Sequence, residues 1–344
     1  MKIALINDTH FGIRNDSSFF LNHFLDFFET QFFPYIKDND IKTIFHLGDL
    51  LDRRKYVNIH TLNKVKKRFI EPLTEMGIEF HMIVGNHDMY YRNTNEINSA
   101  NELFSDYSNF HLHSVPYTFE HDGLCIGLVP WICSENESEV LDYIKNCKCP
   151  IVAGHFELSG HQVLSGVNFK DGMSDKIFSR FETVLSGHFH LRSQKNNVNY
   201  LGTQYEMTYA DSGTQKGFSV LDTETRDIDF IENIDQIFYV ISTEDVDENF
   251  NYSELKNKYV KLIINSNTSK KKSESIVLNI DRAEPFDFTV IEDTSTDETE
   301  KENVDLSKDT ITIINEEIES FDDELDKLKL KKLISDIYIE ALNS

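Results

Sequence analysis

The sequence has few cysteines and no long apolar run. Its 344 residues include 4 cysteines, and Cys147-x-Cys149 does not have the spacing of a redox or zinc motif. A disulfide framework is therefore excluded, and a reducing, cytoplasmic compartment is expected. No apolar run approaches the ~20 residues that cross a bilayer. Because the chain starts directly on a strand-like segment, we expect neither a signal peptide nor contact with a membrane.

Positive charge is also scarce. The chain has 34 Lys and Arg against 59 Asp and Glu, a net charge of −25, and residues 292–326 alone carry −13. This balance argues against binding nucleic acid through bulk electrostatic attraction. Acidic residues that bind metal ions, however, lose their repulsion toward phosphate once the ions are in place. The negative charge therefore argues against a nucleic-acid substrate but does not exclude one.

What the chain does contain is a regular alternation of strand-like and helix-like segments up to about residue 190. Strands are expected near residues 2–7, 43–47, 79–84, 110–114, 124–129, 150–153, 183–185, 198–202, 217–222 and 227–231, and helices near 17–36, 58–76, 95–105 and 138–146. Residues 159–176 have the Gly and Ser content of a loop. The pattern predicts an α/β domain over residues 1–234, with a mixed sheet or a two-sheet sandwich.

A second pattern begins after about residue 235. Strands near 236–242, 259–265 and 287–292, with a helix over 270–282, predict a small α+β unit over residues 235–292. Residues 293–308 are acidic and poor in apolar side chains, which is typical of a flexible linker. Two helices are expected in the remainder, residues 309–344. The second has an apolar face but no core of its own to join, so it either docks on a partner or folds back on the small unit.

Five of the predicted strands end in side chains that bind metals. These strand ends are Asp8-x-His10, Asp49-x-x-Asp52, Asn86-His87-Asp88, His155 and His188-x-His190. Loops that leave the carboxyl ends of strands in a layered α/β fold converge on one edge of the sheet. We therefore expect the five clusters to face one crevice.

Each cluster alone has an ordinary structural explanation. Asp8-Thr9-His10 could be a turn, Asp49 and Asp52 could cap helices, and His155 could be structural. Together they offer oxygen and imidazole donors without a thiolate, a set that suits Mn²⁺, Fe²⁺ or Zn²⁺. The donors are too many for one ion and about enough for two. Two ions ~3.5–4 Å apart can clamp the attacking and leaving oxygens of a phosphoryl displacement.

The ordered clusters, with the glycines that precede them in Gly48-Asp49, Gly85-Asn86, Gly154-His155 and Gly187-His188, resemble the calcineurin-like metallophosphoesterase superfamily. Further stretches are similar to SbcD-type DNA-repair nucleases, including the nuclease subunits of T4-like phage recombination endonucleases. These stretches are Pro130-Trp131, Gly154-His155-Phe156-Glu157-Leu158, Ser186-Gly187-His188-Phe189-His190, Tyr200-Leu201-Gly202-Thr203 and Asp222-Thr223-Glu224-Thr225. The resemblance is strong to about residue 230 and weaker beyond. It implies a four-layer α/β/β/α sandwich with a small capping domain and C-terminal helices.

The resemblance also implies a role for each site residue. One metal ion would be held by Asp8, His10, Asp49 and His190, and the other by Asp49, Asn86, His155 and His188. His87 would face the scissile phosphate and bind no metal, Asp88 would orient nearby imidazoles, and Asp52 would orient His87. Arg53 and Arg54 would contact phosphate, with a solvated surface as the alternative. The two ions are expected to be Mn²⁺.

The resemblance implies partners as well. These are DNA, covered by the 235–292 unit, and an SMC-like coiled-coil ATPase bound by the C-terminal helices. Lys270, Lys271 and Lys272 of that unit would contact the DNA phosphates, with a solvated turn as the alternative. A homodimer through helices 58–76 and 95–105, within a heterotetramer, is also implied. The expected function is a two-metal exonuclease and endonuclease in DNA recombination, repair or replication. The alternatives are a phosphatase or cyclic-nucleotide phosphodiesterase of the same superfamily, and a scaffold that binds without catalysis.

Overall fold

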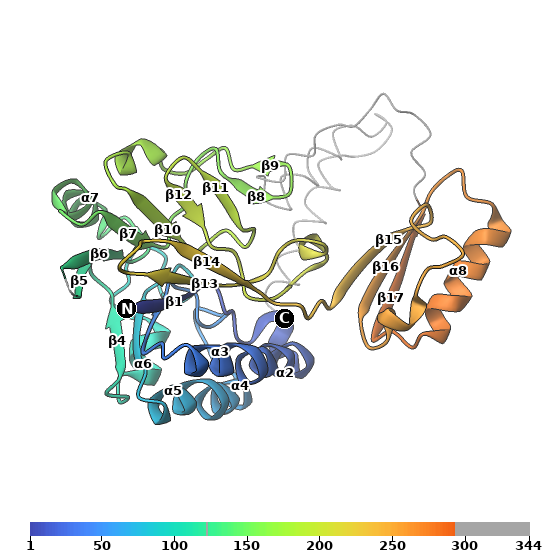
Figure 1. The fold of residues 1–344 in the computed structure, drawn as a ribbon, viewed down its shortest axis with the longest axis horizontal. Coiled ribbons are helices and arrows are strands. Elements are labelled where there is room, and N and C mark those ends of the chain that lie inside the picture. Colours follow the sequence, from blue (N-terminus) through green and yellow to red (C-terminus); the bar gives the residue numbers. More distant parts are fainter. Residues whose placement is uncertain (122, 293–344) are drawn as a thin grey trace, which may run out of the picture.

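The computed structural model describes residues 1–121 and 123–292, which form two bodies of unequal size joined near residue 235 (Figure 1). The predicted linker over 293–308 and helices over 309–344 lie outside the described residues. Within the described part, no helix combines the length and apolar character needed to cross a membrane. The four cysteines are all free thiols.

Two six-stranded sheets form the larger body. The first contains, in spatial order, β14 (Ile228–Glu232), β13 (Gly217–Asp222), β1 (Lys2–Ile6), β2 (Thr43–His46), β3 (Glu79–Ile83) and β4 (Phe110–His113). The second contains β11 (Ser193–Lys195), β12 (Val198–Tyr200), β10 (Thr183–Ser186), β7 (Ile151–Gly154), β6 (Leu124–Val129) and β5 (Tyr117–His121). β1 to β4 pair in parallel, as do β6, β7, β10 and β12. The predicted α/β fold with two sheets is confirmed.

Alternating side chains of the strands explain why the two sheets pack face to face. Ile3 and Leu5 of β1 point into a core shared with the second sheet, whereas Ala4 and Ile6 point toward helices. Successive side chains of a strand face opposite sides, so a strand buried on both sides reads as a continuous apolar run. A third core, beyond the second sheet, buries Val140 and Ile144 of α7 (Glu137–Asn146). The layers are therefore helix, sheet, sheet and helix, as predicted.

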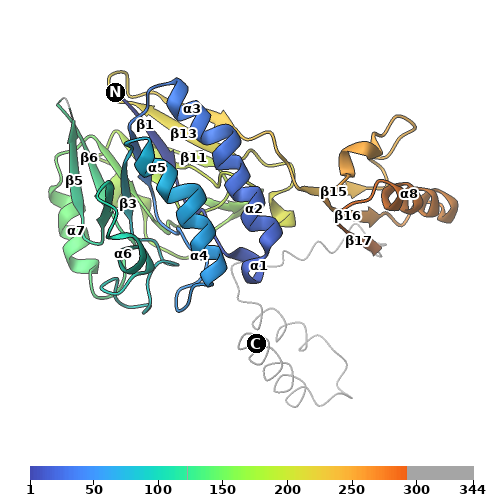
Figure 2. The same cartoon turned by 90° about the horizontal axis from the view of Figure 1, so that it is seen from below.

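Two long helices cover the outer face of the first sheet and lie side by side (Figure 2). One runs through α2 (Ser18–Phe27), η1 (Phe28–Phe32) and α3 (Phe33–Asp38), and the other through α4 (Ile59–Val65), η2 (Lys66–Ile70) and α5 (Glu71–Glu75). Each contains one π-helical turn directly before the segment that carries Pro34 or Pro72. Proline removes a backbone donor and clashes with the preceding turn, and a widened turn relieves this conflict.

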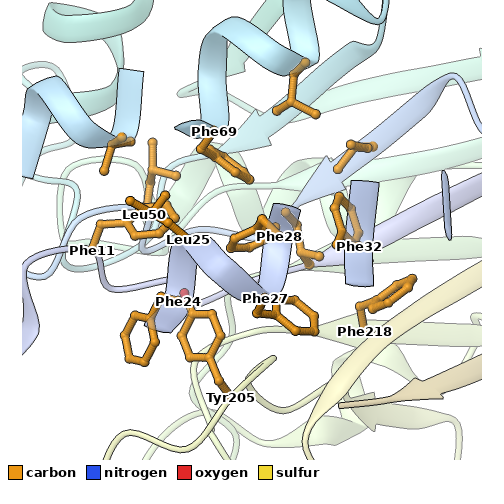
Figure 3. Close-up of a cluster of buried hydrophobic side chains, with 14 of the residues drawn as sticks. Phe11, Phe24, Leu25, Phe27, Phe28, Phe32, Leu50, Phe69, Tyr205 and Phe218 are labelled. Carbon is orange, nitrogen blue, oxygen red and sulfur yellow. The ribbon is translucent and has the colours of Figure 1, made fainter. Parts of the chain in front are cut away.

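Phenylalanines of the first of these helices fill the space beneath it (Figure 3). The Phe28 ring lies 4.6 Å from that of Phe69 and 5.4 Å from that of Phe32, and the Phe24 ring stacks on Tyr205 at 3.6 Å. Phe28 has no exposed surface. The helix predicted near residues 17–36 therefore has an aromatic packing surface, which holds the helices on the sheet that presents the strand-end loops.

The smaller body is a three-stranded parallel sheet in the order β15 (Phe238–Ser242), β16 (Tyr259–Ile264) and β17 (Asp287–Glu292), covered by α8 (Lys270–Arg282). A short turn of 3₁₀ helix, η5 (Tyr252–Leu255), precedes β16. The body is attached to the larger one by Glu206, whose Oε2 accepts 2.8 Å hydrogen bonds from the amides of Ile237 and Phe238. Phe238 and Tyr259 are buried in the core beneath α2.

Several short elements differ from the sequence expectations. The helix predicted over 95–105 is α6 (Ser99–Phe104), capped by Asn98. The predicted loop 159–176 contains a small hairpin, β8 (Gln162–Leu164) and β9 (Val167–Asn168), and reaches into η3 (Asp175–Phe178). β5 and β11 are edge strands with polar residues, so they lack the apolar signal of a buried strand. Two further short elements are η4 (Tyr209–Asp211) and α1 (Ile13–Asp16), in which Arg14 and Asn15 have left-handed backbones.

The packing of Phe28 gives a stability prediction. Phe28→Ala is expected to lower the free energy of unfolding by about 3–5 kcal/mol, because it leaves a cavity between the helix and the sheet. Urea denaturation followed by circular dichroism measures the change. Ile234→Ala, at a side chain that is 82% exposed, is the control and should change stability by less than about 0.5 kcal/mol. Equal effects of the two substitutions would contradict this description of the core.

Candidate metal centre

All five predicted clusters lie at the carboxyl ends of parallel strands. Asp8 and His10 follow β1, Asp49 and Asp52 follow β2, and Asn86-His87-Asp88 follows β3 in the first sheet. His155 follows β7, and His188 and His190 follow β10 in the second sheet. The two sheets face each other, so the five loops meet at one rim of the sandwich.

A first group of donors surrounds Oδ1 of Asp8. His10 Nε2 lies 3.8 Å from this oxygen and His190 Nε2 lies 4.0 Å from it. Oδ2 of Asp49 is 3.7 Å from His10 Nε2. Such separations, somewhat longer than hydrogen bonds, are those of donors that share one ion at ~2.0–2.2 Å from each.

A second group surrounds Oδ1 of Asn86. This oxygen lies 2.9 Å from His155 Nε2 and 3.1 Å from His188 Nδ1. Asp49 Oδ2 is 3.4 Å from the same nitrogen of His155. Asp49 is therefore within reach of both groups, which is the arrangement that a bridging carboxylate requires. The structure brings together all seven predicted ligands.

The residues fit divalent cations by their hydrogen bonding as well as by their spacing. Oδ1 of Asp8 and Nε2 of His10 are buried and have no hydrogen-bond partner among the described residues. Buried polar atoms are normally paired, because an unpaired one loses its interactions with water. A cation would satisfy both atoms. The donors are oxygen and imidazole nitrogen with no thiolate, which matches the predicted class of metal.

The buried carboxylates and imidazoles of the site shift one another's pKa values. Burial acts to raise the pKa of Asp49, but the adjacent His155 holds it well below its ordinary value. Burial acts to lower the pKa of His155, yet Asp49 and Asp8 together raise it to about 9. By contrast, burial and the charge of His10 lower the pKa of His190 to about 4. The two carboxylates thus favour a positive charge at His155, and a cation bound there would compete with a proton.

Backbone strain is concentrated in the same loops. Asp8, His10, Asp49 and His188 all have positive φ angles, between 42° and 81°. This left-handed region costs a residue with a side chain on the order of 1–3 kcal/mol, and such strain is typical of functional sites. Gly85 meets the loop of Asp49 so closely that a Cβ atom there would overlap the Asp49 carboxylate. The glycine before Asn86 is thus required for the two loops to touch.

The Asp88 carboxylate is buried and its hydrogen bonds come from backbone amides. Oδ2 accepts 2.8 Å hydrogen bonds from the amides of Gly85 and Asp49, and Oδ1 accepts a 3.0 Å bond from Leu50. Three backbone amides of two neighbouring loops need acceptors at this point, and Asp88 supplies them. It therefore fixes the backbone that carries Asp49.

Asp52 contacts two imidazoles, one through its carboxylate and the other through its backbone oxygen. Its carboxylate lies 3.3 Å from Nδ1 of His10, so it orients a predicted metal ligand through the nitrogen that faces away from the site. The predicted contact with His87 is made by the backbone oxygen instead, 2.6 Å from His87 Nδ1. Because a carbonyl oxygen only accepts, Nδ1 donates and Nε2 is left as the nitrogen that can gain or lose a proton.

Arg53 and Arg54, the two predicted phosphate contacts, differ in whether the guanidinium already has a partner in the described structure. Arg53 pairs with Asp16 at 3.4 Å and donates to Asn15. Nη1 of Arg54 is buried without a hydrogen-bond partner among the described residues. Arg54 and His87 line the same cavity. Arg54 is therefore better placed than Arg53 to meet an anion beside His87.

Three further side chains near the site do not belong to the predicted strand-end clusters. Glu157 Oε1 lies 3.4 Å from His188 Nε2, and the Trp131 ring lies 5.0 Å from the ring of His188. Buried Lys216 donates a 2.9 Å hydrogen bond to the backbone oxygen of His190 and pairs with Asp211 at 2.6 Å. Glu157 and Trp131 fall within stretches that carried the resemblance, which was a usable signal. Lys216 is 26 residues from His190 in sequence, and no local pattern identifies it.

This fold and this set of ligands define a metallophosphoesterase. Residues 1–192 match the calcineurin-like phosphoesterase family, and the chain belongs to that family. Exonuclease subunit 1 of Enterobacteria phage T4 is 35% identical to it over 233 residues, 68% of this chain and 68% of that protein. The expected family is thereby confirmed, as is the expected class of enzyme, a metal-dependent phosphodiester hydrolase.

Solved structures that align with part of the chain include an archaeal phosphodiesterase and a nuclease of Pseudomonas putida. The first is 14% identical with a TM-score of 0.33, covering 68% of this chain and 100% of that chain. The second is 15% identical with a TM-score of 0.31, covering 63% of this chain and 83% of that chain.

Asn86 and His87 are adjacent, but Asn86 is a proposed metal ligand and His87 is not. Replacing each in turn gives a matched pair of predictions. Asn86→Ala is expected to weaken binding of one divalent ion by about 10-fold or more, because it removes an oxygen shared by His155 and His188. His87→Ala should leave metal binding within about 2-fold of wild type, since no predicted ligand atom is lost.

Isothermal titration with Mn²⁺ at pH 7.5 measures both affinities, and circular dichroism checks that both variants fold. Loss of metal from the His87 variant with retention in the Asn86 variant would mean that the two residues have been assigned the wrong way round.

Proposed function

We propose that the chain is a nuclease that uses two metal ions to hydrolyse DNA phosphodiester bonds, with exonuclease and endonuclease activity. The observation that carries the proposal is the place of Asp49. One carboxylate oxygen lies 3.7 Å from His10 Nε2 and 3.4 Å from His155 Nε2, between the two groups of donors. Two ions sharing such a carboxylate would activate the attacking water and neutralise the charge of the phosphate.

The ligand sets of the proposal are those implied by the resemblance. Asp8, His10, Asp49 and His190 hold one ion, and Asp49, Asn86, His155 and His188 hold the other. Mn²⁺ is the proposed metal, since the donors are carboxylate, amide and imidazole.

The chain's own residues supply orientation and proton transfer. His87 is held by its Nδ1–H on the backbone oxygen of Asp52 and by its amide on Asp49 Oδ1 at 2.7 Å. Its Nε2 is the atom that would stabilise the phosphate and pass a proton to the leaving oxygen. Arg54 would bind the phosphate through its unpaired guanidinium nitrogen. Asp88 and Asp52 keep the loops and the His10 ring in position.

We further propose that the chain works as one subunit of a larger complex in the cytoplasm, the host cytoplasm if it is encoded by a phage. Its relative in phage T4 is called a subunit. The proposed partners are a second copy of this chain, in contact through the helices near 58–76 and 95–105, and an SMC-like ATPase bound by residues 309–344. The small body over 235–292 would cover DNA, with exposed Lys270, Lys271 and Lys272 at the start of α8 toward the phosphates.

The alternatives are less well supported by the same residues. A phosphatase or cyclic-nucleotide phosphodiesterase would use the same metal centre but has no need of the body over 235–292. A scaffold that binds without catalysis would have no need of a complete set of ligands. The expected process is DNA recombination, repair or replication.

The proposal is tested with linear duplex DNA, Mn²⁺ and the purified full chain, alone and with its ATPase partner. We expect fragments or nucleotides to be released by wild type, at least about 10²-fold more slowly by His87→Ala, and not at all after chelation by EDTA.

Lys145→Ala, at an exposed residue of α7, is the matched control and should cut as wild type does. Wild type that is as inert as His87→Ala in every condition would refute the nuclease assignment. Release of phosphate from a phosphopeptide without any cutting of DNA would support the phosphatase instead.

A further inference from the structure

A cavity of about 490 Å³ opens beside the metal centre and shares His87 and Asp52 with it. The rest of its wall is formed by two loop segments, one after β2 and one after β3. Its lining residues, besides these two, are Arg53, Arg54, Lys55, Tyr56, Tyr90, Tyr91 and Arg92. Neither group of metal ligands uses these side chains. A ligand in this cavity would lie directly against the imidazole that faces the reacting phosphate.

The cavity is basic in a chain whose net charge is −25. Its wall contains four cationic side chains and one carboxylate, that of Asp52. Arg53 is paired with Asp16, but neither Arg54 nor Arg92 forms an ion pair within residues 1–121 and 123–292. Burial and the nearby charge of Arg92 lower the pKa of Arg54. Arg54, with its buried and unpaired Nη1, and the exposed Arg92 therefore leave guanidinium groups at this wall that a phosphate can pair with.

The same wall exposes three aromatic rings. Tyr56 is 63% exposed, Tyr91 51% and Tyr90 38%, although most large aromatic residues of the described chain are buried. The rings of Tyr90 and Tyr91 meet edge to face, 4.7 Å apart at an angle of 81°. The guanidinium of Arg53 lies 4.9 Å over the ring of Tyr56. Exposed tyrosines next to basic side chains are a combination with which proteins stack unpaired bases and bind the adjacent phosphates.

The segment that carries Tyr90 and Tyr91 is anchored by the residues next to it. Met89 is fully buried in a small core with Val84 and Cys133. The amide of Tyr90 donates a 2.9 Å hydrogen bond to the backbone oxygen of Ile97. Asp88, which directly precedes Met89, accepts hydrogen bonds from the amides of Gly85 and Asp49. The rings are thus presented from a backbone whose position relative to His87 is fixed.

We propose that this cavity binds an unpaired nucleotide adjacent to the scissile phosphate. The base stacks on Tyr90 and Tyr91, with Tyr56 at the opposite side, and Arg54 and Arg92 bind the neighbouring phosphate. The substrate class is single-stranded nucleic acid, or a strand end that is unpaired where it enters the site, because a base inside a duplex has both faces covered. The inference rests on the proposed nuclease function and extends it to the form of the substrate.

The test compares two single-stranded oligonucleotides that differ at one position. One has a base at every nucleotide, and the other has an abasic residue next to a single cleavable phosphodiester, all other linkages being phosphorothioates. With Mn²⁺, wild type should cut the complete oligonucleotide with a kcat/KM at least about 10-fold above that for the abasic one.

The double variant Tyr90→Ala/Tyr91→Ala should lose that preference, cutting both oligonucleotides at the abasic rate. Tyr90→Phe/Tyr91→Phe keeps the ring faces and should keep the preference, which separates stacking from a general effect on folding. Arg92→Ala should slow both oligonucleotides and reduce the salt dependence of binding by about 0.7 per lost phosphate contact. Lys145→Ala, at an exposed residue of α7 that does not line the cavity, is the control for the charge and should change neither rate.

Equal rates on the two oligonucleotides for wild type, or an unchanged preference in Tyr90→Ala/Tyr91→Ala, would overturn the assignment of the cavity. Absence of cutting of any nucleic acid by wild type would instead refute the nuclease function on which the inference rests. The two failures are therefore distinguishable.

Discussion

The contact between the Asp49 carboxylate and two imidazoles is the interaction on which the rest of the site depends. His10 belongs to the loop after β1 and His155 to the loop after β7, so Asp49 connects ligands from both sheets. The carboxylate and the imidazoles stabilise each other's charges in a buried place where none would be stable alone. A metal centre at this rim requires that the two sheets be packed in one register, which the apolar core between them provides.

Much of the surrounding structure serves to hold that carboxylate and its neighbours still. Asp88 accepts hydrogen bonds from the Asp49 and Gly85 amides, and Gly85 allows the two loops to touch. On the other side, the buried pair of Lys216 and Asp211 fixes the backbone of His190. Breaking such a pair by removing one partner is costly, because the other charge remains buried. The strained backbones of Asp8, His10, Asp49 and His188 are tolerated because this framework holds them.

The sequence was sufficient to predict the layered α/β fold and the position of the seven proposed ligand residues at one rim, because both depend on local order. Apolar runs mark buried strands, and the side chains directly after them reach the rim whatever their partners are. Contacts between distant segments could not be predicted in this way. The hydrogen bonds of Asp88 to backbone amides are an example, since nothing in the sequence shows which amides of neighbouring loops lack acceptors. Lys216 was missed for the same reason.

The aromatic cavity shows a further limit of sequence patterns. Tyr56 and Tyr91 come from different loops, separated by a helix and a strand, and neither stands in a recognisable motif. Only the fold places them together in one cavity with His87, Arg54 and Arg92. The proposed metal centre consists of residues that the sequence marks clearly, whereas the proposed nucleotide site consists of side chains that become neighbours only through tertiary structure.

We propose that two metal ions share Asp49, and the number of ions bound per chain decides whether they do. Mn²⁺ titration of the metal-free full chain, followed calorimetrically, should give two ions per wild-type chain. Asp49→Ala should bind neither ion with comparable affinity, although it folds as judged by circular dichroism. A wild-type stoichiometry of one, or an Asp49→Ala variant that still binds both ions tightly, would contradict the account.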